Sequence, residues 1–307
     1  LHRLIRRQRQ MCIRDRLEAG EFKFVYVVGM NPVLTLPDSH RIIAGFKRED
    51  CFLVVHDTHL TETANLADVV LPATTYLEKT DVIVSDCHPF IRLALKTIEP
   101  QAESRDEYPL MLELAKRMNV DMTWVHVDPW KDMAYNFRNA FKDGDFQDLL
   151  DGKSLQFRYK PIDAYQTKSG KLEFASKSVT EGVSSLPEQL EISSDEDEFI
   201  MLNSSLPQYL HTQFRDVYNE IPRTIWVNPK DAAKHYLTDG ENHIIYNEQG
   251  ELSVNIKITH RIIPGVIWAA RELIDEKGNP QNRLTPGTPQ VIGGGPMFNT
   301  VKIRFKE

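Results

Sequence analysis

The sequence has few cysteines, no long hydrophobic run and no surplus of basic residues. Cys12, Cys51 and Cys87 are far apart and form neither a disulfide framework nor a Cys-x-x-Cys metal site, so we expect reduced thiols and favour a cytoplasmic location. No apolar run approaches the roughly 18 residues that a membrane-spanning helix requires. The formal charge of −7 disfavours sequence-independent nucleic-acid binding, which depends on excess Lys and Arg at the phosphates.

The composition that is present predicts a folded protein with a substantial core. Of the 307 residues, 41% are hydrophobic and 26% are charged, which excludes both a disordered chain and a coiled coil. A chain of this length is too long for one ordinary domain, so we expect two.

The first sixteen residues differ from everything that follows them. They contain six arginines, no lysine and one acidic residue, and they lack the apolar core of a secretory signal. A basic targeting or nucleic-acid-binding arm is one interpretation. Because MCIRDR resembles translated sequencing-adapter sequence, we favour an artefactual or disordered start at residues 1–16, with the natural beginning missing.

The next part of the chain predicts an α/β domain. Short apolar runs at residues 22–28, 51–55 and 68–71 have the β-branched and aromatic character of buried strands. A helix is expected after Asp38, and residues 61–64 resemble a helix start. Alternating strands and helices indicate a parallel, doubly wound sheet, in which ligands bind at the carboxyl ends of the strands.

The second half of the chain changes character. Residues 108–118 have helical spacing, and residues 124–165 predict helical pieces of an insertion. The small, proline and acidic residues of 184–198 are typical of an exposed linker, so we expect domains at 17–195 and 196–307. The short strands beyond the linker predict a β-barrel or sandwich.

Two strand ends carry candidate binding residues. Gly29 permits close approach of a ligand to the backbone, and Asn31 places an amide at the same strand end, although any strand-to-helix turn also uses such residues. The segment is not G-x-G-x-x-G, so a nicotinamide dinucleotide is not indicated. Asp57, after the second strand, has the two acceptor oxygens needed for a ribose hydroxyl or a guanine edge.

His56, His59 and Glu62 recur at a spacing of three. On a helix this spacing would place potential metal ligands on one side, which would suit a metal-dependent hydrolase. The segment begins as a strand end, however, and Asp57 and Thr58 suit turn or capping roles. We therefore assign no metal ligand.

Taken together, several segments resemble one family. In chain order they are GMNP, HDTHLTETANLADVVLPATTYLEKTD, ESRDEYPL, QTKSGKLEFAS, LHTQF, VNPKDAAKHYLTDG, THRIIPGVIWA, QNRLT and GPMFN. This ordered series over residues 17–307 resembles the molybdopterin-dependent oxidoreductases of the dimethyl sulfoxide reductase superfamily, which includes formate dehydrogenases and nitrate reductases.

The resemblance implies a fold and a cofactor. The fold would be a Rossmann-like parallel-sheet domain followed by a C-terminal double-psi β-barrel, together holding bis-molybdopterin guanine dinucleotide with molybdenum or tungsten. Lys79 would offer a cation to pyrophosphate, and Asp57 or Asp106 would accept guanine N–H groups. The implied cofactor contacts are Gly29, Asn31, His56, Asp57, Lys79, Asp106, His211, Thr212, Gln213, Trp268, Asn282 and Asn299.

The chain also departs from the family pattern. Its barrel loop opens with Asn203-Ser204-Ser205 in place of Thr-Gly-Arg, and neither the metal ligand nor clustered iron–sulfur cysteines are present. We expect the cofactor-clamping, C-terminal part of a larger oxidoreductase, with no catalytic residue or metal ligand of its own. The resemblance allows an iron–sulfur cluster in the missing region, a small-molecule substrate and electron-transfer subunits. The alternative is a non-catalytic structural subunit resembling the large NADH dehydrogenase subunit.

Overall fold

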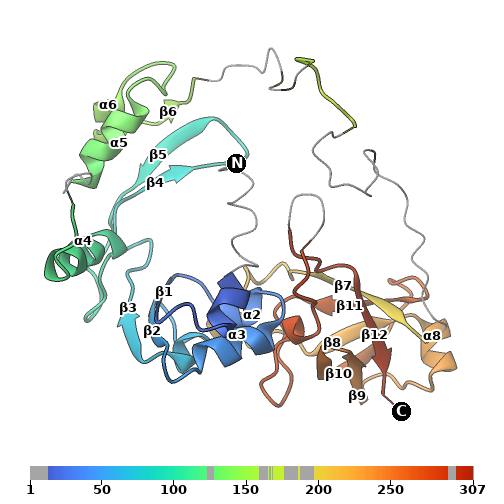
Figure 1. Cartoon of the computed structure of the whole chain (residues 1–307). Coiled ribbons are helices and arrows are strands. Elements are labelled where there is room, and N and C mark those ends of the chain that lie inside the picture. The colour runs from blue at the N-terminus through green and yellow to red at the C-terminus, as the bar shows by residue number, and fades with distance from the viewer. Residues whose placement is uncertain are drawn as a thin grey trace. The chain divides into compact units, whose positions relative to one another are not determined.

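The computed structural model describes residues 13–122, 128–158, 165, 167, 169–175, 186, 197–289 and 295–306 (Figure 1). The chain forms two compact units. The first comprises Leu1–Val54, Leu60–Val69 and Ala175–Glu307, and the second comprises Val55–His59 and Val70–Phe174.

Helices and strands are mixed in the first half, and strands dominate the last third. The strands are β1 (Phe24–Val28), β2 (Phe52–Asp57), β3 (Val69–Pro72), β4 (Asp81–Val84), β5 (Phe90–Ala94), β6 (Leu155–Gln156), β7 (Phe199–Ser204), β8 (Thr224–Val227), β9 (Asn242–Asn247), β10 (Gly250–Ile258), β11 (Val266–Ala270) and β12 (Val301–Phe305). The helices are α2 (Pro32–Thr35), α3 (Ser39–Phe46), α4 (Glu107–Arg117), α5 (Pro129–Phe137), α6 (Phe146–Leu150), α7 (Arg215–Tyr218) and α8 (Pro229–Lys234), and the 3₁₀ turns are η1 (Ala64–Leu66) and η2 (Gln281–Arg283).

The predicted parallel sheet is present in the order β1-β2-β3. Its central strand β2 has four consecutive buried residues, as expected of a parallel strand covered on both faces. Helix α3 begins directly after Asp38, as the sequence predicts, and buries Ile42 and Phe46. The α/β prediction for this region is confirmed.

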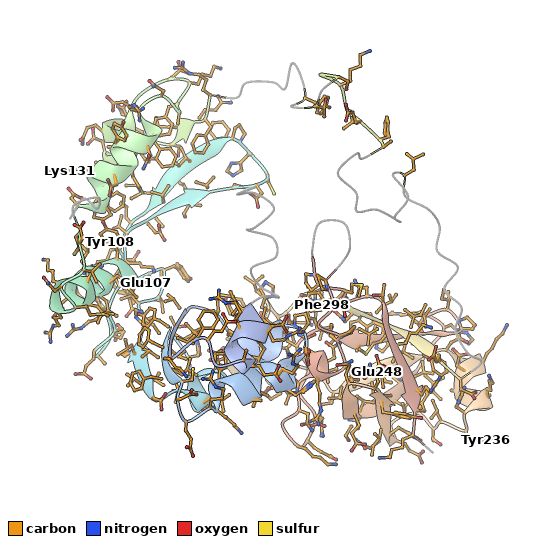
Figure 2. The ribbon with its side chains drawn as sticks, in the orientation of Figure 1. Glu107, Tyr108, Lys131, Tyr236, Glu248 and Phe298 are labelled. Atoms are coloured by element: carbon orange, nitrogen blue, oxygen red, sulfur yellow. The ribbon has the colours of Figure 1, made fainter. Side chains whose placement is uncertain are left out.

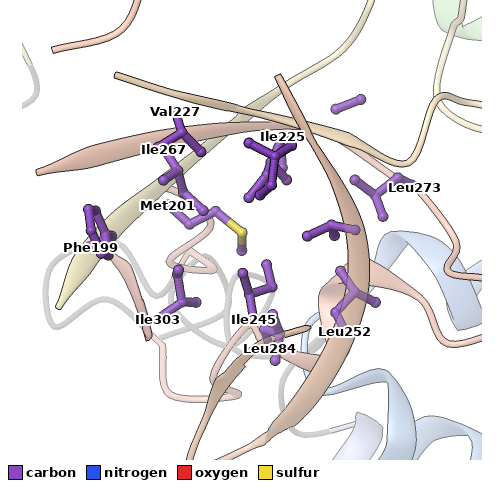
Figure 3. Close-up of a cluster of buried hydrophobic side chains, with 14 of the residues drawn as sticks. Phe199, Met201, Ile225, Val227, Ile245, Leu252, Ile267, Leu273, Leu284 and Ile303 are labelled. Atoms are coloured by element: carbon purple, nitrogen blue, oxygen red, sulfur yellow. The ribbon is translucent and has the colours of Figure 1, made fainter. Parts of the chain in front are cut away.

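Residues 199–305 form a closed barrel in the order β10-β8-β11-β7-β12-β9. The pairs β10–β8 and β11–β7 are parallel and the remaining pairs are antiparallel. Along β10, Leu252, Val254 and Ile256 alternate inward and are at most 1% exposed, because side chains of a strand alternate between its two faces. Figure 3 shows the resulting aliphatic core, which includes Phe199, Met201, Ile225, Val227, Ile245, Leu252, Ile267, Leu273, Leu284 and Ile303.

The second unit contains an antiparallel sheet that the sequence does not predict. Its order is β4-β5-β6, and its core is mainly aromatic. The ring of Phe137 lies 5.9 Å from those of Phe141 and Phe157 and 6.1 Å from that of Phe146. Helices α5 and α6, which supply Phe137 and Phe146, agree with the predicted helical pieces of an insertion.

One predicted helix start is absent, and two predicted boundaries stay predictions. Residues 61–64 do not begin an α-helix, and only the single turn η1 forms there. Most of the predicted linker at 184–198 lies outside the described residues, so the domain boundary stays a prediction. Residues 13–18 are helical, and the Nη1 atom of Arg14 lies 2.8 Å from the buried carboxylate of Asp38. That residues 1–16 lie outside the fold also stays a prediction. The ion pair means that Arg14 contacts the folded part of the chain.

No helix in the described part of the chain has both the length and the apolar character needed to cross a bilayer.

Candidate functional site

The second unit contains a cavity lined by both charged and apolar side chains, here called the Lys79 cavity. It has a volume of about 790 Å³, and its lining includes Thr74, Lys79, Ser104, Asp106, Glu107 and Trp130. The ammonium of Lys79 donates to Oε2 of Glu107 at 2.6 Å. Figure 2 shows Glu107 and Tyr108 at the start of α4. The turn after β3 supplies Lys79 and the first turn of α4 supplies Glu107, while Asp81 of β4 and Lys96 after β5 add further charged groups to the lining.

The pKa values of the two adjacent carboxyls of the cavity shift in opposite directions. Burial raises the pKa of Asp106, a hydrogen bond with Glu107 raises it further, and the Lys79 cation opposes both effects. Burial also acts to raise the pKa of Glu107, but the hydrogen bonds from Lys79 and Asp106 outweigh it and lower that pKa. Glu107 is thus the stronger acid of the two and the ion-pair partner of Lys79, and Asp106 is the weaker acid.

His56 and Asp57 end strand β2 and have different environments. His56 is fully buried, and its Nε2 lies 3.1 Å from the carbonyl oxygen of Arg105. Oδ1 of Asp57 accepts the backbone N–H of His59 at 3.2 Å, so it closes a turn while remaining partly exposed. Since residues 56–62 run from a strand into turns, the three-residue spacing of the metal-hydrolase hypothesis does not define a helix face. Within the described residues, no group of three or more His, Cys, Asp or Glu could hold a metal.

Gly29 and Asn31 follow β1. Gly29 has a φ of +55°, which favours glycine, and an added Cβ there would meet nothing within 4 Å. Asn31 is 4% exposed, and its amide donates to Glu62 at 2.8 Å while its Oδ1 accepts the hydroxyl of Thr63 at 2.7 Å. Open space therefore lies beside the Gly29 backbone, whereas the Asn31 side chain is bound inside the protein.

The barrel loop 205–219, here called the His211 loop, has an unusual backbone. His211, Phe214 and Asn219 all have φ values between +53° and +69°, a conformation that non-glycine residues seldom adopt. Nδ1 of His211 lies 3.6 Å from Oε1 of Glu272, which is 3% exposed and itself has a φ of +63°. Within the loop, Gln213 is exposed and Thr212 is half-buried.

The carboxyl of Glu272 is the buried acid nearest to this loop. Burial raises its pKa, although the charges of Arg271 and His211 act to lower it. The side chain of His211 is exposed to solvent on its other side, at 61%. The buried carboxyl of Glu272 thus lies next to the largely exposed imidazole of His211.

Three further predicted contacts are hydrogen-bonded within the protein. The indole N–H of Trp268 donates to Ser204 at 2.9 Å, and Oδ1 of Asn299 accepts the N–H of Asn203 at 2.9 Å. Asn282 is 1% exposed, and its amide donates to the carbonyl of Leu34 at 2.6 Å.

The structure brings the predicted residues together in two groups. Lys79 and Asp106 share one cavity in the second unit. His56 and Asp57 lie in the same unit but do not line that cavity. The first unit contains Gly29, Asn31, His211, Thr212, Gln213, Trp268, Asn282 and Asn299. The sequence does not single out Glu107, Arg215 or Glu272, because each takes its role from a partner far along the chain.

A parallel-sheet region and a closed mixed barrel define a mixed α/β protein. The molybdopterin oxidoreductase family model matches residues 6–117, and the molybdopterin dinucleotide-binding domain matches residues 199–302. The chain belongs to the molybdopterin oxidoreductases of the dimethyl sulfoxide reductase superfamily.

Similar proteins agree with this assignment. A Bacillus subtilis protein named "Probable oxidoreductase YoaE" is 30% identical over 92% of this chain and 44% of its own length. The F420-dependent formate dehydrogenase subunit alpha of Methanocaldococcus jannaschii is 26% identical over 85% and 40%, and the trimethylamine-N-oxide reductase of Haemophilus influenzae is 25% identical over 80% and 35%. The chain thus spans less than half the length of these relatives.

The fold also matches a solved structure. Acetylene hydratase from Pelobacter acetylenicus superposes with a TM-score of 0.74 and 19% identity, over 97% of this chain and 46% of that one. This likeness supports the fold.

Proposed function

We propose that this chain is the cofactor-clamping part of a molybdenum or tungsten oxidoreductase that binds bis-molybdopterin guanine dinucleotide. The bound cofactor supplies the chemistry, a two-electron or oxygen-atom transfer on a small substrate. The role of the chain is to bind and orient it. The match to both family models and the relatives named as reductases and a formate dehydrogenase support the proposal.

The residues of the Lys79 cavity fit one nucleotide end of this cofactor. Lys79 would face pyrophosphate as a cation, and Asp106 would pair with guanine N–H donors, as would Asp57 at the end of β2. Gly29 would let the cofactor approach the backbone, since no side chain fills the space beside it. His211, Thr212 and Gln213 would contact the other pterin from their exposed loop.

The barrel and domain assignments are part of the same proposal. We assign the barrel to the double-psi type, which is supported by its mixture of two parallel pairs with antiparallel ones. We place the domains at 17–195 and 196–307, the first ending before the barrel strand β7. We further propose that a region outside this chain provides the metal ligand, any iron–sulfur cluster and contacts to electron-transfer subunits.

The alternative, a structural subunit without pterin, predicts no retained nucleotide site. The observation that favours binding is the Lys79 cavity, whose lining includes the Lys79–Glu107 ion pair and the carboxyl of Asp106. A group that serves only the fold would more commonly be packed or solvated.

Single substitutions of Asp106 and Asp57 test the proposal. Losing a charge-assisted pair with guanine costs about 1.5–3 kcal/mol, so Asp106→Ala or Asp57→Ala should lower cofactor retention roughly tenfold or more. The measurement is molybdenum or tungsten and guanine nucleotide released from the purified protein, with Arg223→Gln in the barrel as control. Unchanged occupancy in both folded variants would favour the structural subunit.

A further inference from the structure

One side-chain network joins segments that are far apart in the sequence. The guanidinium of Arg215 donates twice to the carboxylate of Glu62, from Nη1 to Oε1 at 2.8 Å and from Nη2 to Oε2 at 3.0 Å. Oε2 of Glu62 also accepts the amide of Asn31 at 2.8 Å. Oδ1 of Asn31 in turn accepts the hydroxyl and the backbone N–H of Thr63, at 2.7 and 3.2 Å. All four residues lie in the first unit.

The Arg215–Glu62 pair is shielded and has two parallel hydrogen bonds. Its side chains are 17% and 27% exposed, whereas Glu220, the second partner of Arg215, is 77% exposed. Burial acts to raise the pKa of Glu62, but the hydrogen bonds from Arg215 and Asn31 lower it overall. A forked, partly buried pair holds its geometry better than an exposed ion pair.

The Arg215–Glu62 pair lies next to the backbone positions of the His211 loop that have positive φ values. Arg215 begins α7 directly after Phe214, which has a φ of +69°, and four residues after His211, with a φ of +53°. Such conformations persist only where surrounding contacts hold them. The hydroxyl of Tyr209 bonds to the carbonyls of Tyr218 and Asn219, but these contacts stay inside the loop. Arg215 instead links the loop to the segment after β2.

We propose that Arg215 and Glu62 are positioning residues, which hold the His211 loop in place for the second pterin. The side chain of Asn31 then orients the Glu62 carboxylate and does not contact the cofactor. The assignment of a pterin to this loop rests on the proposed function, whereas the anchoring of the loop rests on the network itself.

Hydrogen exchange of the intact cofactor-free protein tests the anchor. Arg215→Gln and Glu62→Gln should each accelerate amide exchange in residues 205–219 by roughly tenfold or more, because each leaves a shielded charge without its partner. The double variant should exchange no faster than the faster single variant, since both changes break the same link. Arg223→Gln, which breaks a more exposed ion pair outside the loop, should leave exchange in this loop unchanged.

A second measurement on the loaded protein separates positioning from general stability. The half-time for guanine nucleotide release should fall in Arg215→Gln and be partly restored in Arg215→Lys, which keeps the charge but lacks the fork. Arg215→Lys also replaces Arg215→Gln in the exchange measurement should the latter not fold. Unchanged exchange in residues 205–219 for both single variants, or additive effects in the double variant, would overturn the anchor. A wild-type protein that retains no pterin would refute the proposed function, while the exchange data would still decide the network.

Discussion

The Lys79 cavity and the His211 loop present polar groups in different ways. In the cavity, the lining includes Lys79, Asp106 and Glu107, which pair mainly with one another. Elsewhere in the first unit, the polar side chains of Asn31 and Asn282 are buried and already bound to protein atoms. A residue that the family resemblance assigns to the cofactor can thus have one of two roles. Its side chain can face a cavity, or it can be hydrogen-bonded inside the protein and hold other segments in place.

The two units also differ in their cores, and matched leucines test that difference. Leu252 in the barrel and Leu149 in the second unit are both fully buried. Replacing either with Ala should lower the free energy of unfolding by about 2–5 kcal/mol. We expect the larger loss for Leu252→Ala, because a closed barrel cannot collapse around the missing atoms. Urea denaturation measures both, and an equal or larger loss at Leu149 would contradict the comparison.

The next largest effect distinguishes structural from available polar groups. Asn282→Ala leaves the buried carbonyl of Leu34 without its donor, so we expect a loss of about 1–3 kcal/mol in stability. A reduction in cofactor retention should appear only alongside that loss. Chemical unfolding and nucleotide content of the same preparation check this, and normal stability with lost cofactor would identify Asn282 as a direct contact.

Glu62 and Glu272 should give opposite pH dependences of stability. The ordinary pKa of a glutamate is 4.5; hydrogen bonding lowers that of Glu62, and burial raises that of Glu272. Glu62 therefore contributes stability above pH 4.5 that is lost as the pH falls through its lowered pKa. Glu272 favours the folded state below pH 4.5, and this contribution is lost as the pH rises through its raised pKa.

Glutamine variants separate these two contributions. Glu62→Gln should flatten the stability curve below pH 4.5, and Glu272→Gln should flatten its fall above pH 4.5. The measurement is the free energy of unfolding over a pH series spanning that value. Identical pH profiles for wild type and Glu272→Gln would show that the carboxyl is not perturbed by its burial.

The smallest stability effect is expected in the Lys79 cavity. The Lys79–Glu107 pair is only partly shielded, so Lys79→Gln should change stability by no more than about 1 kcal/mol. Cofactor retention should fall nonetheless, because the cation that we propose to face pyrophosphate is lost. Thermal unfolding with nucleotide analysis checks this pair of outcomes, and a large stability loss would place Lys79 among the structural groups.

Much of the fold could be predicted from local patterns. The apolar runs of β1 and β2 and the helical spacing of α4 lie where the sequence places them, because burial of one face imposes a period on a segment. The β4–β5 hairpin was not predictable in this way. Ile83, Val84 and Phe90 are exposed there, so its strands lack the usual inside–outside alternation.

By itself, the sequence determined the family, the parallel-sheet region, the barrel strands and the residue types of a dinucleotide site. Only the tertiary structure decided which of those residues are available. It enclosed Asn31 and Asn282 in hydrogen bonds, gathered Lys79, Asp106 and Glu107 around a cavity, and paired Arg215 with Glu62 across 153 positions. The physical reason is that periodicity reports the burial of apolar faces, whereas the partner of a polar group depends on which distant segments fold against it.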